Sequence, residues 1–190
     1  MAKIGIKGLV YAPYSSGGDG SAIVYTGGVA LDDYMIRADL NEERSDVSFY
    51  ADDHKIDAEN GLTGVSISLE LSNLTDALEK ALLGYTDGTG GELNVTDKDA
   101  PFVGVGFTRK ERFKGAVTYH GYWIYKVQFA KDSDSTQTKG DSIDFQTETL
   151  TGNAMGVKLT SGGDTIYYSH IRNTAESTVV AWVKSKGGVT

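Results

Sequence analysis

Apolar residues recur at every second position in several stretches of this chain. In Val65–Leu71 a valine, an isoleucine and two leucines alternate with two serines and a glutamate. The same period of two runs through residues 103–107, 143–149 and 155–159. Because successive side chains of a strand point to opposite faces of a sheet, this period predicts strands that each bury one face. This period therefore predicts a β-rich fold for most of the chain.

Two further runs are apolar on both faces. Residues 122–130 carry aromatic side chains on either side and predict a central strand. The run Val-Val-Ala-Trp-Val at 179–183 predicts another strand of this kind. The 24 glycines, several of them in adjacent pairs, separate the apolar runs and predict turns between the strands.

One segment follows a helical period instead. Leu74, Leu78 and Leu82 lie four residues apart and form an apolar stripe. Asn73 is placed to accept hydrogen bonds from the first free amides of this helix, and Gly84 follows as its stop signal. Together the patterns predict an all-β fold in a single domain over residues 1–190. We expect a two-sheet β-sandwich or partly closed barrel with one flanking α-helix at about residues 73–83.

Composition narrows the functional classes. The chain has no cysteine, which excludes disulfides, thiolate metal sites and cysteine nucleophiles. A net charge of −8 argues against a general nucleic-acid binder, since such proteins carry basic surfaces. The first residues lack the apolar core of a signal peptide, and no stretch reaches the ~18 apolar residues of a transmembrane helix. We therefore expect the protein to stay where it is synthesised unless a larger particle carries it out.

The charge is unevenly distributed along the chain. Residues 32–59 hold ten acidic and three basic residues, a net charge of −7, whereas residues 109–114 carry +3. These runs are interpreted either as two solvated loops or as complementary contact patches. Because residues 41–60 are dense in charge and short of apolar side chains, they predict an extended hairpin or loop that orders on contact with another subunit. The candidate contact residues, between subunits or along a channel, are Asp52, Asp53, Asp57, Glu59, Arg109, Lys110, Arg112 and Lys114.

No constellation of catalytic residues stands out. The run Gly140-Asp-Ser142 matches the opening of one lipase motif but lacks the aspartate and histidine that should follow it, so it predicts a turn. The acidic residues around His54 are interpreted as a charged hairpin. The run from Asp132 lacks the glycine and closing glutamate of a calcium loop. The sequence therefore predicts no catalytic residue, no metal site and no cofactor.

An aromatic cluster leaves one alternative open. Tyr119, Tyr122, Trp123 and Tyr125 lie close together in the sequence and are interpreted first as core residues. The alternative is a sugar-stacking platform of the kind that β-sandwich lectins use. That alternative predicts a carbohydrate-binding module, and a hydrolase with an unrecognised site is the third hypothesis.

Several stretches together have a recognisable order. They are Ile4–Val10 with Pro13, Phe49–Asp53, Val65–Leu71 with the helix ending at Gly84, Ala100–Phe107, Gly121–Lys131, Thr136–Lys139 and Ile143 with Phe145. Over about residues 4–150, this order resembles the major tail protein family of siphophages. Members of that family form the tube of a long, non-contractile phage tail.

The resemblance implies a structural role and no enzymatic activity. It implies a virion protein, made in the host cytoplasm, whose copies form hexameric rings that stack into a tail tube. The implied partners are the chain itself and the tape measure, tail terminator and distal tail proteins, with no membrane involved. DNA would pass through the lumen during ejection without specific binding. Because contractile tails use related tubes, the tail type stays open.

Overall fold

The computed structural model describes residues 2–51, 54–131 and 147–189, except for the side chains of 46–51 and 54–59. Within these residues the chain is mostly β, with one large antiparallel sheet, a small second sheet and two helices. The predicted all-β class is therefore confirmed.

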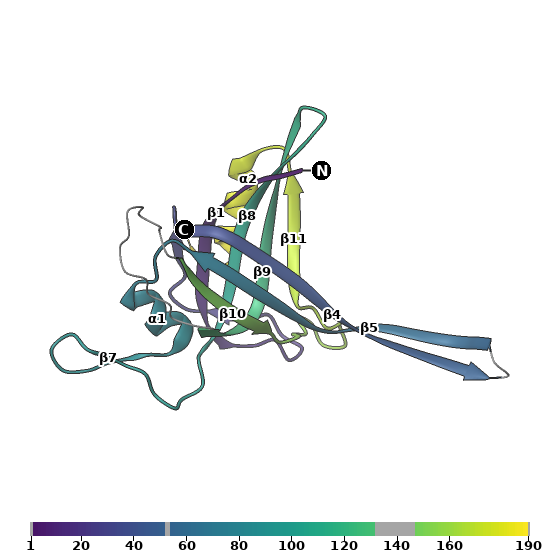
Figure 1. Ribbon diagram of the computed structural model, residues 1–190, viewed down its shortest axis with the longest axis horizontal. Coiled ribbons are helices and arrows are strands. Elements are labelled where there is room, and N and C mark those ends of the chain that lie inside the picture. The colour runs from purple at the N-terminus through teal and green to yellow at the C-terminus, as the bar shows by residue number, and fades with distance from the viewer. Residues whose placement is uncertain (1, 52–53, 132–146, 190) are drawn as a thin grey trace, which may run out of the picture.

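Nine strands form the large sheet (Figure 1). They are β1 (Ala2–Ser16), β2 (Val24–Tyr25), β3 (Val29–Leu31), β4 (Met35–Ala51), β5 (His54–Leu71), β8 (Phe102–Phe113), β9 (Ala116–Lys131), β10 (Glu148–Ala154) and β11 (Tyr168–Asn173). Their order is β2-β1-β8-β9-β10-β5-β4, with β3 also on β1 and β11 also on β9. The small sheet pairs β6 (Thr86–Asp87) with β7 (Leu93–Asn94).

Strand β9 lies at the centre of the large sheet. One of its edges pairs with β8 along nearly its whole length. The other edge is shared, because β11 pairs with Tyr119–Ile124 and β10 with Val127–Lys131. This arrangement confirms the central strand predicted for residues 122–130. The sheet curls until β4 crosses in front of β8 and β9 and lies against β1, which gives a partly closed barrel (Figure 1).

The inside of this barrel holds the main core. Its buried residues come from alternate positions of β1, β5, β8, β9 and β10, as the period of two predicts. Helix α1 (Asp76–Leu83) adds Leu78, Leu82 and Leu83 to the same core. Gly84 ends the helix as predicted, with φ +77° and its amide bonded to the Lys80 carbonyl. The predicted cap was wrong, because Thr75 rather than Asn73 accepts a hydrogen bond from the Leu78 amide.

A second helix, α2 (Glu176–Lys186), lies where the sequence predicts a strand at 179–183. Val179 and Val183, four residues apart, are its buried side chains and pack on the outer face of β8 and β9. Glycines make that face flat: a Cβ at Gly106 would lie 2.7 Å from Val183 Cγ1, and one at Gly121 2.8 Å from Val179 Cγ1. The fold therefore has two flanking helices rather than one.

The C-terminal strand predictions are corrected in part. Of the strand predicted at 143–149, residues up to 146 lie outside the described part of the chain, as does the predicted polar loop at 132–140. The described strand β10 begins at Glu148. The strand predicted at 155–159 is reduced to single bridges at Val157 and Lys158, because the chain leaves the sheet there on its way to β11.

Candidate functional site

A two-stranded ribbon projects from the body of the molecule. Strands β4 and β5 pair from Met35 opposite Leu71 out to Ala51 opposite His54. Strand β10 supports β5 only along Val65–Leu71, so beyond the pair Glu43–Gly64 the two strands have only each other (Figure 1). Two-stranded ribbons without a third strand or a packed face are marginally stable in water. This projecting part, residues 44–62, is called the ribbon below.

The ribbon carries the predicted acidic residues. Asp57 and Glu59 lie in β5, opposite Phe49 and Val47 of β4, and their side chains are outside the described part. Asp52 and Asp53 lie outside the described residues altogether. Residues 46–60 hold five acidic residues and one lysine, a net charge of −4.

The base of the ribbon is tied to β11. The Tyr168 hydroxyl donates a hydrogen bond of 2.8 Å to Glu42 Oε1, while Glu42 Oε2 pairs with Arg44 at 2.8 Å. The hydrogen bond from Arg44, and then the one from Tyr168, lower the pKa of Glu42. Burial, together with the bond to Glu42, raises the pKa of Tyr168 to about 12. These contacts fix the direction in which the ribbon leaves the body.

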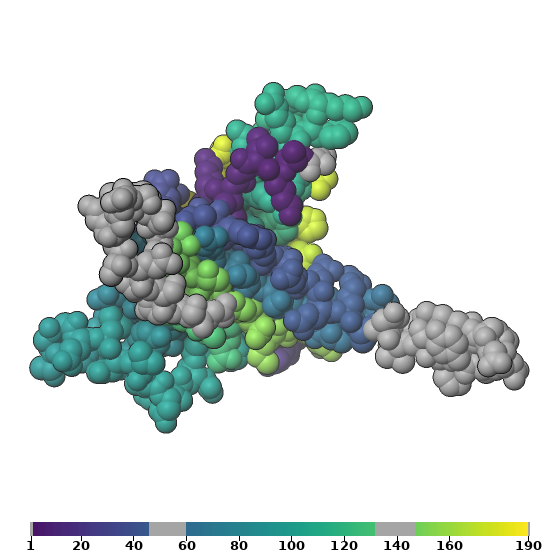
Figure 2. Space-filling model, in the orientation of Figure 1, coloured from purple at the N-terminus to yellow at the C-terminus, as the bar shows by residue number. Residues whose placement is uncertain are grey.

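The predicted basic residues lie on a second projection, the β8–β9 hairpin. Unlike the ribbon, this hairpin has a third strand beside it. Strand β1 runs beside β8 as far as Ala2 opposite Arg112, so the β8–β9 hairpin has a third strand almost to its end. Lys114 and Gly115 form the turn with φ +47° and +86°. A pair of positive φ angles matches the twist of hairpin strands. In Figure 2 this hairpin stands clear of the body beside the N-terminal residues.

Arg109 is separated from the other three basic residues by the direction of its side chain. It lies on the inner face of the barrel, where Nη2 donates a 2.7 Å hydrogen bond to the Tyr122 hydroxyl and pairs with Glu111 at 2.6 Å. Lys110, Arg112 and Lys114 are exposed, and none has an ion pair within the part of the chain that the structure describes. These three residues, with the half-exposed Phe113, form the surface called the basic tip below.

A buried pair, Glu111 and His120, lies behind the basic tip. Both side chains are almost fully buried, and His120 Nε2 lies 3.3 Å from Glu111 Oε2 without forming a hydrogen bond. Burial lowers the pKa of His120, against the opposing effect of Glu111. Sequence reasoning missed this pair because Glu111 stands inside a charged run whose alternation is typical of a solvated strand.

Two of the four clustered aromatic residues, Trp123 and Tyr125, are core residues, and Tyr119 and Tyr122 are partly buried. Trp123 is fully buried beneath α2, and its Nε1 donates to the Tyr25 hydroxyl at 3.2 Å. That hydroxyl in turn donates to the Tyr125 carbonyl at 2.6 Å. Trp123 and Tyr125 belong to the second core cluster, so neither ring is open to stack on a sugar.

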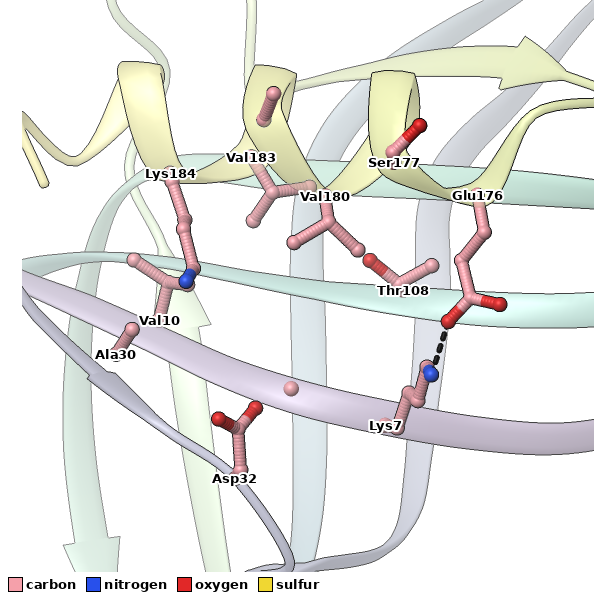
Figure 3. A pocket seen from close by; sticks show the side chains of 12 residues that line it. Lys7, Val10, Ala30, Asp32, Thr108, Glu176, Ser177, Val180, Val183 and Lys184 are labelled. Atoms are coloured by element: carbon pink, nitrogen blue, oxygen red, sulfur yellow. Dashed lines mark ion pairs between the residues drawn. The ribbon is translucent and has the colours of Figure 1, made fainter. Parts of the chain in front are cut away.

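A groove of about 670 Å³ runs between α2 and the strands β1 and β3 (Figure 3). Its floor is apolar, with Val10, Ala30, Val180 and Val183, and an ion pair between Lys7 and Glu176 crosses one end. Nothing in the sequence pattern indicated this groove, because it depends on the unpredicted helix α2.

Similarity to known proteins adds few constraints on the function of this chain. No protein-family model matches the chain, and no curated protein matches it. Among the described residues there is no cluster of side chains suited to hold a metal ion. Neither described helix is long and apolar enough to cross a membrane.

Proposed function

We propose that this chain is a structural subunit of a bacteriophage tail tube. Copies of it assemble into hexameric rings, and the rings stack around the channel through which DNA is ejected. The order of sequence stretches that resembles the major tail protein family supports this proposal, together with the all-β fold and its two flanking helices.

The proposal rests mainly on the ribbon, which has no third strand to support it among those that the structure describes. Fixing each residue of a backbone costs roughly 1–2 kcal/mol of conformational entropy, which an isolated strand pair recovers poorly. The outer edge of β4 also has no partner strand within the described residues. Such an edge is an aggregation hazard unless another chain completes it. A long ribbon with a free edge is therefore what a self-assembling subunit needs and what a monomeric protein avoids.

The charge of the chain fits the proposed channel. At a net charge of −8 per copy, a ring of identical subunits surrounds its axis with a negative field. Such a field repels the phosphates of DNA and lets the duplex slide without adhering. The rival carbohydrate-binding hypothesis loses its main residue, because Trp123 is buried.

Electron microscopy and sedimentation of the purified protein test the proposal. Over a wide range of concentration, we expect rings or short tubes in equilibrium with monomer. The matched variant replaces residues 46–60 with Asn-Gly, which joins Ser45 to its partner Gly61 by a two-residue hairpin turn in the same register. This variant should keep the far-UV circular dichroism of a β protein and remain monomeric. Wild-type protein that stays monomeric at every concentration and salt would overturn the proposal.

A further inference from the structure

The side of the basic tip that faces the barrel is held by contacts with its neighbours. Its other side is exposed. Its strand β8 is held between β1 and β9, and the inner face is fixed by the Arg109–Glu111 pair and the contact with Tyr122. Lys110 and Lys114 lie over the rings of Tyr119 and Phe113, at 5.9 and 5.5 Å from the ring centroids. The tip is therefore a preformed projection with three exposed cations, one of which, Lys114, lies over the exposed ring of Phe113.

Such a surface has the composition of a contact site. Phe113 is 51% exposed although it is a large apolar residue, and its neighbours Arg112 and Lys114 are exposed with it. Aromatic residues and arginine are enriched where protein interfaces are energetically strongest. On a chain whose net charge is −8, a projecting cluster of +3 points to an acidic partner.

The same chain carries the acidic partner, but in a place that the tip cannot reach. The ribbon, with a net charge of −4 over residues 46–60, leaves the body in a different direction from the β8–β9 hairpin (Figure 1). The two projections therefore cannot meet within one molecule. They can meet between two molecules, and a contact between two different surfaces of identical copies leaves one of each surface free to continue the assembly.

We propose that the basic tip, Lys110, Arg112, Phe113 and Lys114, is the docking surface for the acidic ribbon of a second copy of this chain. The proposal rests on the proposed function and deepens it, because it names the partner of the ribbon. The contact is directional: each copy offers its ribbon to one neighbour and its tip to another. Single exposed ion pairs contribute only ~0–1 kcal/mol, so several pairs and the burial of Phe113 act together.

Charge reversal tests this contact. Arg112→Glu with Lys114→Glu changes the charge of the tip from +3 to −1, and Asp46→Lys, Asp57→Lys and Glu59→Lys together change the charge of residues 46–60 from −4 to +2. Either set alone should raise the concentration needed for assembly at least tenfold, and both sets together should restore most of it. The matched control, Lys98→Glu with Lys158→Glu, changes the net charge as much as the tip reversal does, at exposed lysines outside the tip. Equal effects of the control and the tip reversal would overturn the proposal, as would failure of the variant that combines both sets of changes to recover.

Disulfide trapping gives a geometric readout that does not depend on charge. Because the chain has no cysteine, a variant with Arg112→Cys and Asp57→Cys holds one thiol on each projection. A directional contact should give a ladder of covalently linked copies on a non-reducing gel, whereas each single variant can give dimers at most. Dimers without a ladder from the double variant, while the wild-type chain still forms rings, would overturn the docking contact alone. Absence of any wild-type assembly would instead overturn the proposed function.

Discussion

Glu111 and His120 face each other across the β8–β9 pair, with 3.3 Å between Glu111 Oε2 and His120 Nε2, and both are buried behind the basic tip. Arg109, from β8, shares the same carboxylate through its other oxygen at 2.6 Å. The charges of Arg172 and His170, from β11, also act on His120. The hairpin that supports the tip is thus held by a small, buried set of titratable groups.

This arrangement predicts an acid-sensitive hairpin. Burial holds the pKa of His120 below its ordinary value of 6.5, so the folded state favours the neutral ring. The stabilising effect is complete above the unfolded pKa and is lost as the pH falls through the window below 6.5. The thermal unfolding midpoint of the wild-type protein should therefore fall between pH 7 and pH 5. His120→Asn should flatten that dependence, while the exposed His170→Asn should leave it in place.

Amide hydrogen exchange should separate the ribbon from the rest of β5. In the monomer, residues 46–60 should exchange rapidly, since their strands lack a third partner, whereas Val65–Leu71 should be protected by β10. Assembly should slow exchange in 46–60 and leave 65–71 unchanged. Equal protection of 46–60 in both states would show that the ribbon is stable without a partner.

Gly106 should tolerate no side chain. A Cβ there would lie 2.5 Å from Trp123 Cε3 and 2.7 Å from Val183 Cγ1, so Gly106→Ala should push α2 away from the sheet. We expect a loss of about 1–3 kcal/mol in the free energy of unfolding. Denaturant titration followed by tryptophan fluorescence measures it. Gly5→Ala in β1, which has open space around the added methyl, is the control and should change stability little.

Removing the Tyr168 hydroxyl should loosen the base of the ribbon. Tyr168→Phe loses the 2.8 Å hydrogen bond to Glu42, at a cost of about 1 kcal/mol or less because the site is exposed. The wild-type protein should also lose stability between pH 10 and about 12, as the raised pKa of Tyr168 is crossed. Absorbance titration of phenolate should show late-titrating tyrosines, and the variant should have one fewer of them, because burial also raises the pKa of Tyr11, Tyr25 and Tyr122.

A substitution at the turn residue Lys114 should change stability and assembly in opposite directions. Its φ of +47° is unfavourable for a residue with a Cβ, so Lys114→Gly should stabilise the monomer by up to about 1 kcal/mol. The same change removes a charge from the basic tip and should weaken assembly. A thermal melt and a sedimentation series on one sample compare the two effects. Parallel changes in both would contradict the assignment of Lys114 to the contact.

The local sequence pattern was sufficient to predict much of this fold. Alternation in Val65–Leu71 predicted a strand with one buried face because burial of alternate residues is decided by the sheet itself. Helix α2 was missed because its run of β-branched and aromatic residues favours a strand, and only Val179 and Val183 are buried by the flat glycine surface of β8 and β9. No local sequence pattern predicts that surface, because it forms where segments far apart in the chain come together.

The candidate contact residues show the same limit. Charge counts along the chain located both the acidic ribbon and the basic run. They could not separate Arg109, which turns inward to Glu111, from Arg112, which stays exposed, because a count of charges does not show which face of the strand is the inner one. Side-chain direction in a strand follows from register, and register depends on neighbours far away in the sequence.

Pairing in the ribbon is regular from Ser45 opposite Gly61 to Phe49 opposite Asp57, so its length follows directly from the number of residues in the two strands. Each residue of a strand advances the chain by about 3.3 Å, and side chains return to the same face every second residue. Adding two residues to β4 and two to β5 beyond the pair Ser45–Gly61 would lengthen the reach by about 6.6 Å without turning any other side chain over. Odd additions would invert every residue past the insertion. In the proposed assembly, the spacing between neighbouring copies would therefore change in steps of two residues, with the body of the subunit unchanged.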